Sequence, residues 1–211
     1  MNNTKIRELI CELCRNFYHS GWATGTGGSI SIREGSSIFM TPSGVQKEWI
    51  KSADIFELDL SGNVIFDSGH GLKLSQCAPV FMKAYDIRGA GAVLHSHSKN
   101  AVLATILCSE KKIFSVSHME MIKGISGMCA SDTLEIPIID NTNFEYDLAD
   151  SFAQALQAYP KSPAVLVQNH GIYVLGNNWE QAKTQAECLD YLFDLEVQRF
   201  KMGSSFFNNV L

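Results

Sequence analysis

Three histidines, His95, His97 and His170, stand in contexts that are typical of ligands to one divalent metal ion. His95 and His97 form a His-x-His pair after an apolar run, and His170 follows a second such run and precedes a glycine. Short apolar runs of this kind predict buried strands. Side chains two residues apart on a strand point to the same face, so the pair can reach one ion. A third imidazole from a later strand end would leave a coordination position open for water or substrate, as in catalytic zinc sites.

The simpler alternative is that each histidine is an ordinary polar residue at the end of a strand. For one isolated histidine this alternative would be preferred. The His-x-His pair together with a His-Gly after another strand favours the metal instead. Three neutral imidazoles suit zinc, and iron, cobalt and manganese are also chemically possible. The sequence therefore predicts a metal centre, with zinc as the expected ion.

The composition is that of an ordinary globular protein, with 211 residues, 45% hydrophobic and 18% charged. A net charge of −5 and the lack of a basic run argue against nucleic acid and a membrane surface as partners. No apolar stretch approaches the roughly 20 residues of a membrane span, and the N-terminus lacks the apolar core of a signal peptide. We expect a single domain over residues 1–211, with its core at about 5–203, a short C-terminal tail and a cytoplasmic location.

The six cysteines are scattered along the chain without a close-spaced framework, which suits a reducing cytosol. Cys11 and Cys14 do form a Cys-x-x-Cys, but they lie inside an amphipathic helical pattern with no strand before it. We interpret them as residues that face the core, in preference to a redox or zinc site.

The spacing of apolar residues predicts an alternation of helices and strands. The expected helices cover residues 4–19, 77–88, 99–107, 144–159 and 179–202, with a short helix at 119–123. The expected strands cover residues 29–32, 37–40, 55–60, 63–66, 90–95, 112–116, 134–139, 163–169 and 172–175. Compact connections at 60–63 and 169–172 favour antiparallel neighbours. This pattern predicts an α/β layered domain with a mixed, mainly antiparallel sheet.

Four segments in a fixed order carry a family resemblance: residues 26–31 (Thr-Gly-Gly-Ser-Ile-Ser), 41–44 (Thr-Pro-Ser-Gly), 95–97 (His-Ser-His) and 169–171 (Asn-His-Gly). In these segments the chain resembles the class II aldolase/adducin family, and the resemblance extends over about residues 5–203. It implies a three-layer α/β/α sandwich and one zinc per subunit, held by His95, His97 and His170. It also implies a homotetramer with active sites at subunit contacts. Phe206 and Phe207 would then be either a loose tail or, as we favour, an anchor onto a neighbouring subunit.

Other segments, such as Ser75-Gln76-Cys77 and residues 118–124, match dehydratase members of the family. Aldolase members place a catalytic Glu at the position of Cys77, and this departure counts against aldol cleavage. The resemblance implies loss of water from a methylthio-substituted ketose phosphate in methionine salvage, with Glu120 as the acid/base. Partial burial beside Met119 and Met121 would raise the pKa of Glu120 toward neutrality, which suits either role. The alternative for Glu120 is a solvated turn residue.

The substrate phosphate is expected to bind backbone amides and hydroxyls, because glycines let the backbone approach a ligand closely. The predicted substrate-binding residues are Cys77, Gly27, Gly28, Ser29, Ser43, Gly44 and Ser75. Lys47 or Lys73 could add charge. A lone Gly-rich loop is more often a tight turn, and only its occurrence beside the other motifs favours a phosphate site. For Cys77, a position at a helix start would lower the thiol pKa; the alternative is a small buried residue.

Two other classes of function stay open at this stage. A sugar-phosphate aldolase or 4-epimerase would share the metal, the phosphate loop and the enolate-type chemistry, so the fold cannot separate them. A non-catalytic interaction module would use the fold as adducin heads do, but it would have no need of three histidines around an open metal site.

Overall fold

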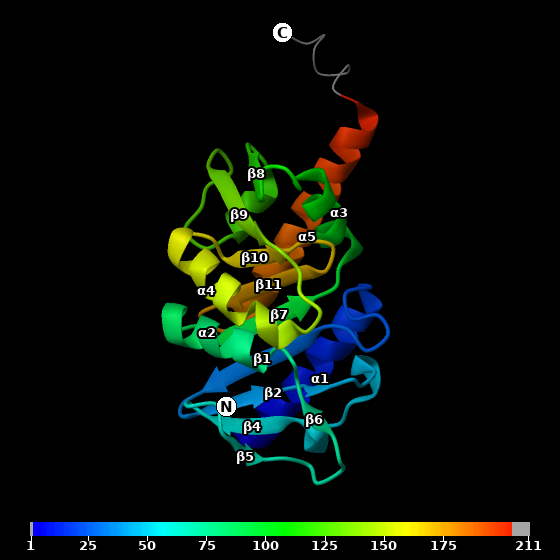
Figure 1. Ribbon diagram of the computed structural model, residues 1–211, viewed down its shortest axis with the longest axis vertical. Coiled ribbons are helices and arrows are strands. Elements are labelled where there is room, and N and C mark those ends of the chain that lie inside the picture. Colours follow the sequence, from blue (N-terminus) through cyan, green and yellow to red (C-terminus); the bar gives the residue numbers. More distant parts are fainter. Residues whose placement is uncertain (1, 204–211) are drawn as a thin grey trace.

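A nine-stranded mixed sheet forms the centre of the computed structural model, which describes residues 2–203 (Figure 1). The strand order is β5-β4-β2-β1-β7-β11-β10-β9-β8. Every neighbouring pair in this sheet is antiparallel except β9 and β10, which are parallel. The α/β class with a mainly antiparallel sheet is therefore confirmed. The strands are β1 (Ser29–Glu34), β2 (Ser37–Met40), β4 (Phe56–Asp59), β5 (Val64–Phe66), β7 (Ala92–Ser96), β8 (Ile113–Ser117), β9 (Thr133–Ile139), β10 (Ala164–Val167) and β11 (Gly171–Gly176).

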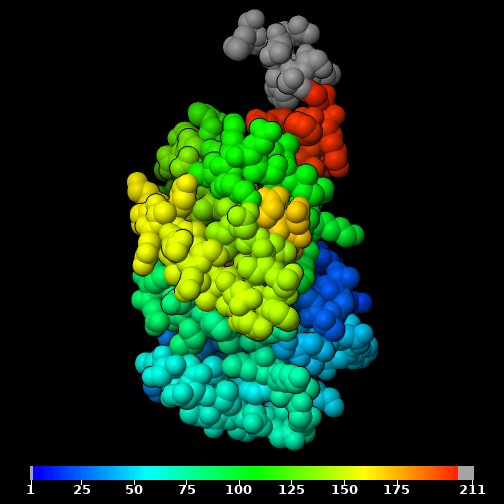
Figure 2. All heavy atoms as spheres, in the orientation of Figure 1, coloured from blue at the N-terminus to red at the C-terminus, as the bar shows by residue number. Residues whose placement is uncertain are grey.

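Helices cover both faces of this sheet, so the molecule has three layers (Figure 1). One core cluster joins the sheet to α1, α3 and α5, and the other joins it to α2 and α4. In Figure 2 the yellow segment that includes α4 covers the face of the sheet turned to the viewer. The α-helices are α1 (Asn3–His19), α2 (Ala78–Arg88), α3 (Lys99–Leu107), α4 (Ala149–Ala158) and α5 (Trp179–Met202), and the short 3-10 helices are η1 (Lys47–Trp49), η2 (Ser52–Asp54), η3 (Glu120–Gly124) and η4 (Glu145–Leu148).

The central strands β7, β10 and β11 are buried along their whole length. Their side chains alternate between the two cores: Leu94 and Val174 pack on the α1/α5 side, whereas Val93 and Tyr173 pack on the α2/α4 side. Burial on both faces explains why these segments read as continuous apolar runs in the sequence. His95 follows the same alternation and therefore points to the α2/α4 side, next to Tyr173.

The predicted helix at 144–159 is wrong at its start. Phe144 has extended backbone, η4 follows it, and the α-helix begins only at Ala149. The Thr142 hydroxyl donates to the Phe144 carbonyl and stabilises this bend. The short pair β3 (Pro42–Ser43) and β6 (Lys73–Leu74) was not predicted, because two-residue strands have no periodicity.

Cys11 and Cys14 lie on α1 and are both buried in the core, which confirms their interpretation as core residues. Burial raises the pKa of Cys11 to about 11 and raises that of Cys14 further, so both thiols stay protonated. None of the helices in residues 2–203 combines the length and apolarity needed to cross a bilayer. Phe206 and Phe207 lie outside the described residues, and the single-domain boundary of 1–211 stays a prediction.

Candidate metal centre and adjoining pocket

The three predicted histidines converge on one point. The Nε2 atom of His97 lies 2.9 Å from Nε2 of His95 and 3.0 Å from Nε2 of His170. His95 is on β7 and His97 is just beyond its end, whereas His170 lies in the turn between β10 and β11. Because β11 pairs directly with β7, this turn is delivered to the end of the His-x-His strand. Only glycine permits that approach, since a Cβ atom on Gly171 would overlap the Ser96 carbonyl.

Hydrogen bonds fix the orientation of two of the rings. His95 Nδ1 lies 3.1 Å from the Ile172 carbonyl oxygen, which can only accept, so this nitrogen is the donor. His170 Nδ1 lies 3.0 Å from Asn141 Oδ1 in the same way. Donation from Nδ1 leaves Nε2 as the lone-pair atom, as in metal-binding histidines. His95 also stacks on Tyr173, with ring centroids 4.1 Å apart.

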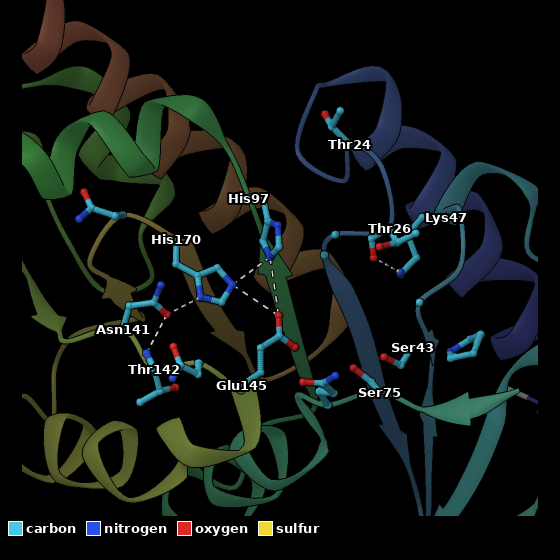
Figure 3. Close-up of a pocket in the computed structure, with 17 residues that line it drawn as sticks. Thr24, Thr26, Ser43, Lys47, Ser75, His97, Asn141, Thr142, Glu145 and His170 are labelled. Atoms are coloured by element: carbon cyan, nitrogen blue, oxygen red, sulfur yellow. Dashed lines mark hydrogen bonds and ion pairs between the residues drawn. The ribbon is translucent and has the colours of Figure 1, made fainter.

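Burial keeps the first ligand neutral. His95 is fully buried, and desolvation lowers its pKa to about 4. A neutral imidazole is the form that binds a metal. His97 and His170 are more accessible and face the adjoining pocket (Figure 3).

A carboxylate that was not among the predicted site residues completes the cluster. Glu145 Oε1 lies 3.4 Å from Nε2 of His95 and of His170, and 3.7 Å from Nε2 of His97 (Figure 3). Ligands at about 2.0–2.1 Å from a tetrahedral zinc are roughly 3.3 Å apart, so these separations suit one ion. Burial alone would raise the pKa of Glu145, but the three imidazoles hold it well below its usual range. The four residues form the one group of this kind among residues 2–203.

Glu145 reaches the histidines through the parallel pair β9 and β10. These two strands end at the same edge of the sheet, with Ile139 opposite Val167. The segment after β9 therefore passes close to His170, which follows β10. This shared edge is the signal that could have identified the loop after residue 139 as part of the site. Glu145 was missed in the sequence analysis because a helix was expected at 144–159. In such a helix nothing would indicate that the Glu145 side chain points toward β7.

Cys77 lies directly behind Glu145, at the N-terminal end of α2. Its thiol donates a hydrogen bond of 2.9 Å to Glu145 Oε2, and the Tyr173 hydroxyl lies 3.5 Å from its sulfur. Of the two alternatives for Cys77, the structure favours the small buried residue over the thiol with a lowered pKa. Desolvation of the buried side chain, followed by the negative charge of Glu145, raises the pKa of Cys77 well above its usual value. Cys77 is thus a neutral thiol that positions a carboxylate.

A pocket of about 640 Å³ opens beside the metal cluster. Five of the predicted substrate-binding residues line it: Gly27, Gly28, Ser43, Gly44 and Ser75. The sixth, Ser29, is buried beneath them and its hydroxyl lies 2.8 Å from Thr41 Oγ1 and 2.9 Å from Ser75 Oγ. The Gly-rich loop also approaches the metal cluster, because a Cβ atom on Gly27 would overlap the His97 ring. The structure thus brings the two predicted sites, metal and phosphate, into one cavity.

Glu120 lies outside this cavity. It is the first residue of η3, its side chain is 75% exposed, and it forms an ion pair of 2.9 Å with Lys123. Within one subunit Glu120 is not partly buried, because Ile122 is the residue of η3 that enters the core. Glu120 does not line the pocket, and its hydrogen-bond partner among the described residues, Lys123, does not line it either. Its catalytic role stays a prediction that a single subunit does not fulfil.

Comparison with known proteins decides the family. Residues 8–197 match the Class II Aldolase and Adducin N-terminal domain. The chain belongs to this family. The match spans nearly all of the described fold and includes the histidines, the Gly-rich loop and Glu145.

Relatives with a named activity are about half identical to this chain. It is 52% identical to "Methylthioribulose-1-phosphate dehydratase" of Homo sapiens, over 93% of this chain and 84% of the relative. It is 49% identical to a probable enzyme of the same name from Drosophila ananassae, over 93% of this chain and 90% of the relative. A probable bifunctional methylthioribulose-1-phosphate dehydratase/enolase-phosphatase E1 of Oryza sativa subsp. indica is 49% identical, but this chain spans only 41% of its length.

The fold is also that of solved class II aldolases. An L-fuculose 1-phosphate aldolase superimposes with a TM-score of 0.77 over 94% of this chain and 88% of that protein, at 21% identity. The L-fuculose-1-phosphate aldolase from Thermus thermophilus gives a TM-score of 0.71 at 20% identity, over 95% of this chain and 98% of that one. These likenesses establish the architecture, whereas the activity must be argued from the site.

Proposed function

We propose that this chain is a metal-dependent hydro-lyase that removes water from 5-methylthioribulose 1-phosphate to give 2,3-diketo-5-methylthiopentyl 1-phosphate, a step of methionine salvage. The observation that carries the proposal is the convergence of three imidazoles and one carboxylate beside a pocket lined by hydroxyl groups and glycines. The relatives named as methylthioribulose-1-phosphate dehydratases support the choice of substrate.

The donor set fits one zinc per subunit. Three nitrogen ligands, two of them with tautomers fixed by hydrogen bonds, and an oxygen ligand at near-tetrahedral separations suit this ion. When bound, zinc supplies Lewis-acid stabilisation of the negative charge that develops on the substrate oxygens as the proton leaves the neighbouring carbon. His95, His97 and His170 would hold the ion, and Glu145 would complete its coordination in the free enzyme.

The remaining residues of the pocket orient the substrate. The amide group of Gly28 and the hydroxyls of Ser43 and Ser75 can bind the phosphate, which places the ketone toward the histidines. The N–H of Gly27 donates to the Thr24 carbonyl, so Gly27 contributes close approach of the backbone. Such fixed orientation lowers the entropic part of the barrier. The thiol of Cys77 stays behind Glu145 and holds that carboxylate in place.

Glu120 remains our candidate for the acid/base, which takes the proton from C3 or protonates the departing C4 hydroxyl. Since its own subunit holds it away from the pocket, this role requires that a second copy of the chain presents it. The proposed assembly is therefore a homo-oligomer, a tetramer by the family resemblance, with active sites completed at subunit contacts. A cytoplasmic location is part of the same proposal.

The test combines elemental analysis with turnover of 5-methylthioribulose 1-phosphate, before and after treatment with a chelator. We expect one zinc per subunit, a product with the ultraviolet absorbance of an enolisable diketone, and loss of turnover on chelation. Two carbon fragments in place of the diketone would indicate an aldolase. A purified chain that carries no metal and binds none would favour the non-catalytic interaction module.

A further inference from the structure

The pocket has two chemically different ends (Figure 3). His97, His170 and Glu145 gather at one end, and Lys47 lies at the other, beside Thr26 of the Gly-rich loop. Among the described residues that line the cavity, Lys47 is the one lysine or arginine. A ketose phosphate has the same two parts: a ketone that suits the metal ligands, and on the neighbouring carbon a phosphate that suits the lysine.

Lys47 is buried to an extent that is unusual for lysine. Only 2% of its surface is exposed, and it ranks among the largest fully buried side chains of the described fold. Its Nζ atom donates to the carbonyl oxygens of Thr26 at 3.0 Å and of Val45 at 3.1 Å. An ammonium group has three donors, so these two bonds leave one N–H for a further acceptor.

This ammonium group has no counter-ion within the described part of the chain. No carboxylate oxygen of residues 2–203 lies within 4.0 Å of Lys47 Nζ, the limit for an ion pair. The negative charges of Glu145 and Glu48 influence Lys47 from farther away. A buried charge without a partner is costly, and buried lysines are normally paired. The arrangement therefore calls for an anion at this end of the pocket.

The other groups that line the pocket indicate which anion fits beside Lys47. Ser43 and Ser75 supply hydroxyls, and the loop at Gly27 and Gly28 supplies backbone that a ligand can approach closely. All these groups can donate hydrogen bonds, and the pocket's carboxylate, Glu145, is with the histidines at the opposite end. Several hydrogen-bond donors in one cavity with an ammonium group suit a phosphate dianion.

We propose that Lys47 is the residue by which the pocket selects a phosphorylated substrate. Its third N–H binds the phosphate, while its bonds to Thr26 and Val45 hold the Gly-rich loop in the conformation that presents its amides. Lys73, the other lysine that the sequence offers for this role, is exposed on β6 and lies outside the cavity wall. The inference rests on the proposed function and assigns its substrate specificity to one side chain.

A lysine with a purely structural role would make the same contacts with Thr26 and Val45. The test must therefore separate a structural role of Lys47 from phosphate binding. Loss of a structural tie lowers stability and affects all ligands alike. Loss of a phosphate ligand instead weakens binding of phosphorylated compounds selectively, with KM rising more than kcat falls. Lys47→Met keeps the volume and removes the charge, Lys47→Arg restores the charge, and Lys51→Met is a matched control at an exposed lysine.

The experiment uses the metal-loaded protein and calorimetric titration with inorganic phosphate, together with the KM for 5-methylthioribulose 1-phosphate. For Lys47→Met we expect roughly 10- to 100-fold weaker phosphate binding and a comparable rise in KM, the range of a hydrogen bond to a charged group. Lys47→Arg should recover part of both, and Lys51→Met should match the wild-type protein.

Equal phosphate affinity and KM in wild type and Lys47→Met, with both folded by circular dichroism, would overturn the proposal. A large effect of Lys73→Met with none from Lys47→Met would overturn it as well. The outcome is separable from the proposed function. If the wild-type protein binds phosphate through Lys47 but does not turn over the ketose phosphate, the dehydratase proposal fails while the anion site stands.

Discussion

The two ends of the pocket are built in different ways. The metal end lies where the buried strands β7 and β11 meet: His95 is on β7, and His170 is in the turn that leads into β11. Carbonyl and amide oxygens fix the orientations of these two rings. The other end, which we propose binds phosphate and call the phosphate end, is formed by the Gly-rich loop, the two-residue strand β3 and the side chain of Lys47. Groups that polarise a reacting bond must be held rigidly, whereas groups that recognise a substituent can lie on loops. We therefore expect changes at the metal end to lower kcat and changes at the phosphate end to raise KM.

The largest effect should come from removing a histidine at the metal end. We expect His97→Ala to lose most of the bound metal and to reduce turnover below detection, because the variant keeps only three of the four ligand groups and loses a nitrogen donor from the cluster. Inductively coupled plasma mass spectrometry and the dehydration assay check the two parts. His19→Ala, at an exposed histidine at the end of α1 and outside the cavity, is the control. Full metal content in His97→Ala would contradict the site.

Glu120→Gln should come next, with a loss of about 10²–10⁴-fold in kcat and normal metal content, the range for a positioned acid/base group. Glu110→Gln, at another exposed carboxylate, should retain full activity. Near-native turnover of Glu120→Gln would remove this residue from the mechanism.

The requirement for a second subunit has its own test. Inactive His97→Ala and Glu120→Gln proteins, when unfolded and refolded together, should regain part of the activity, because some mixed contacts then combine an intact metal site with an intact Glu120. Subunits refolded separately and then combined without exchange are the control. Mixed oligomers with no activity would show that Glu120 does not act across a contact.

Glu145→Gln tests whether the carboxylate contributes to metal binding. The neutral amide keeps the shape of the side chain but removes the negative charge, so we expect zinc to bind roughly 10- to 100-fold more weakly, a range typical of groups that tune a metal site. Competition with a fluorescent zinc chelator measures the affinity. Asp147→Asn, an exposed carboxylate on the same short helix η4, should bind zinc as wild type does. Unchanged affinity in Glu145→Gln would mean that the carboxylate does not contact the ion.

A smaller effect is expected for Ser43→Ala at the phosphate end. Loss of one neutral hydrogen bond should raise KM by about 2- to 10-fold and leave kcat nearly unchanged. Ser36→Ala, in the exposed hairpin between β1 and β2, is the control. A fall in kcat with unchanged KM would contradict the division between the two ends of the pocket.

The apolar periodicity of the strands was the main basis for predicting the metal site. His95, His97 and His170 follow apolar runs that must be buried strands, and β-sheet pairing then brings strand ends together. The Gly-rich and Thr-Pro-Ser-Gly segments were recognisable by their residue types, and the structure places both around the pocket. Local sequence and long-range pairing agree in these regions.

The carboxylates were harder to predict, because both lie in short 3-10 helices that follow strands. Glu145 enters the site through a bend at Phe144, and no periodic pattern marks that bend. Glu120 was expected to be partly buried beside apolar neighbours, but η3 buries Ile122 instead and leaves Glu120 with Lys123. Side-chain direction in such short segments is set by tertiary contacts, which a single sequence does not display.

The most direct test of the central claim is X-ray absorption spectroscopy of the zinc-loaded protein at the zinc edge. A shell of nitrogen and oxygen atoms at about 2.0–2.1 Å, with the outer-shell scattering of three imidazole rings, is the predicted result. A sulfur shell at about 2.3 Å would place the ion on cysteines such as Cys11, Cys14 or Cys77 instead and would contradict the account.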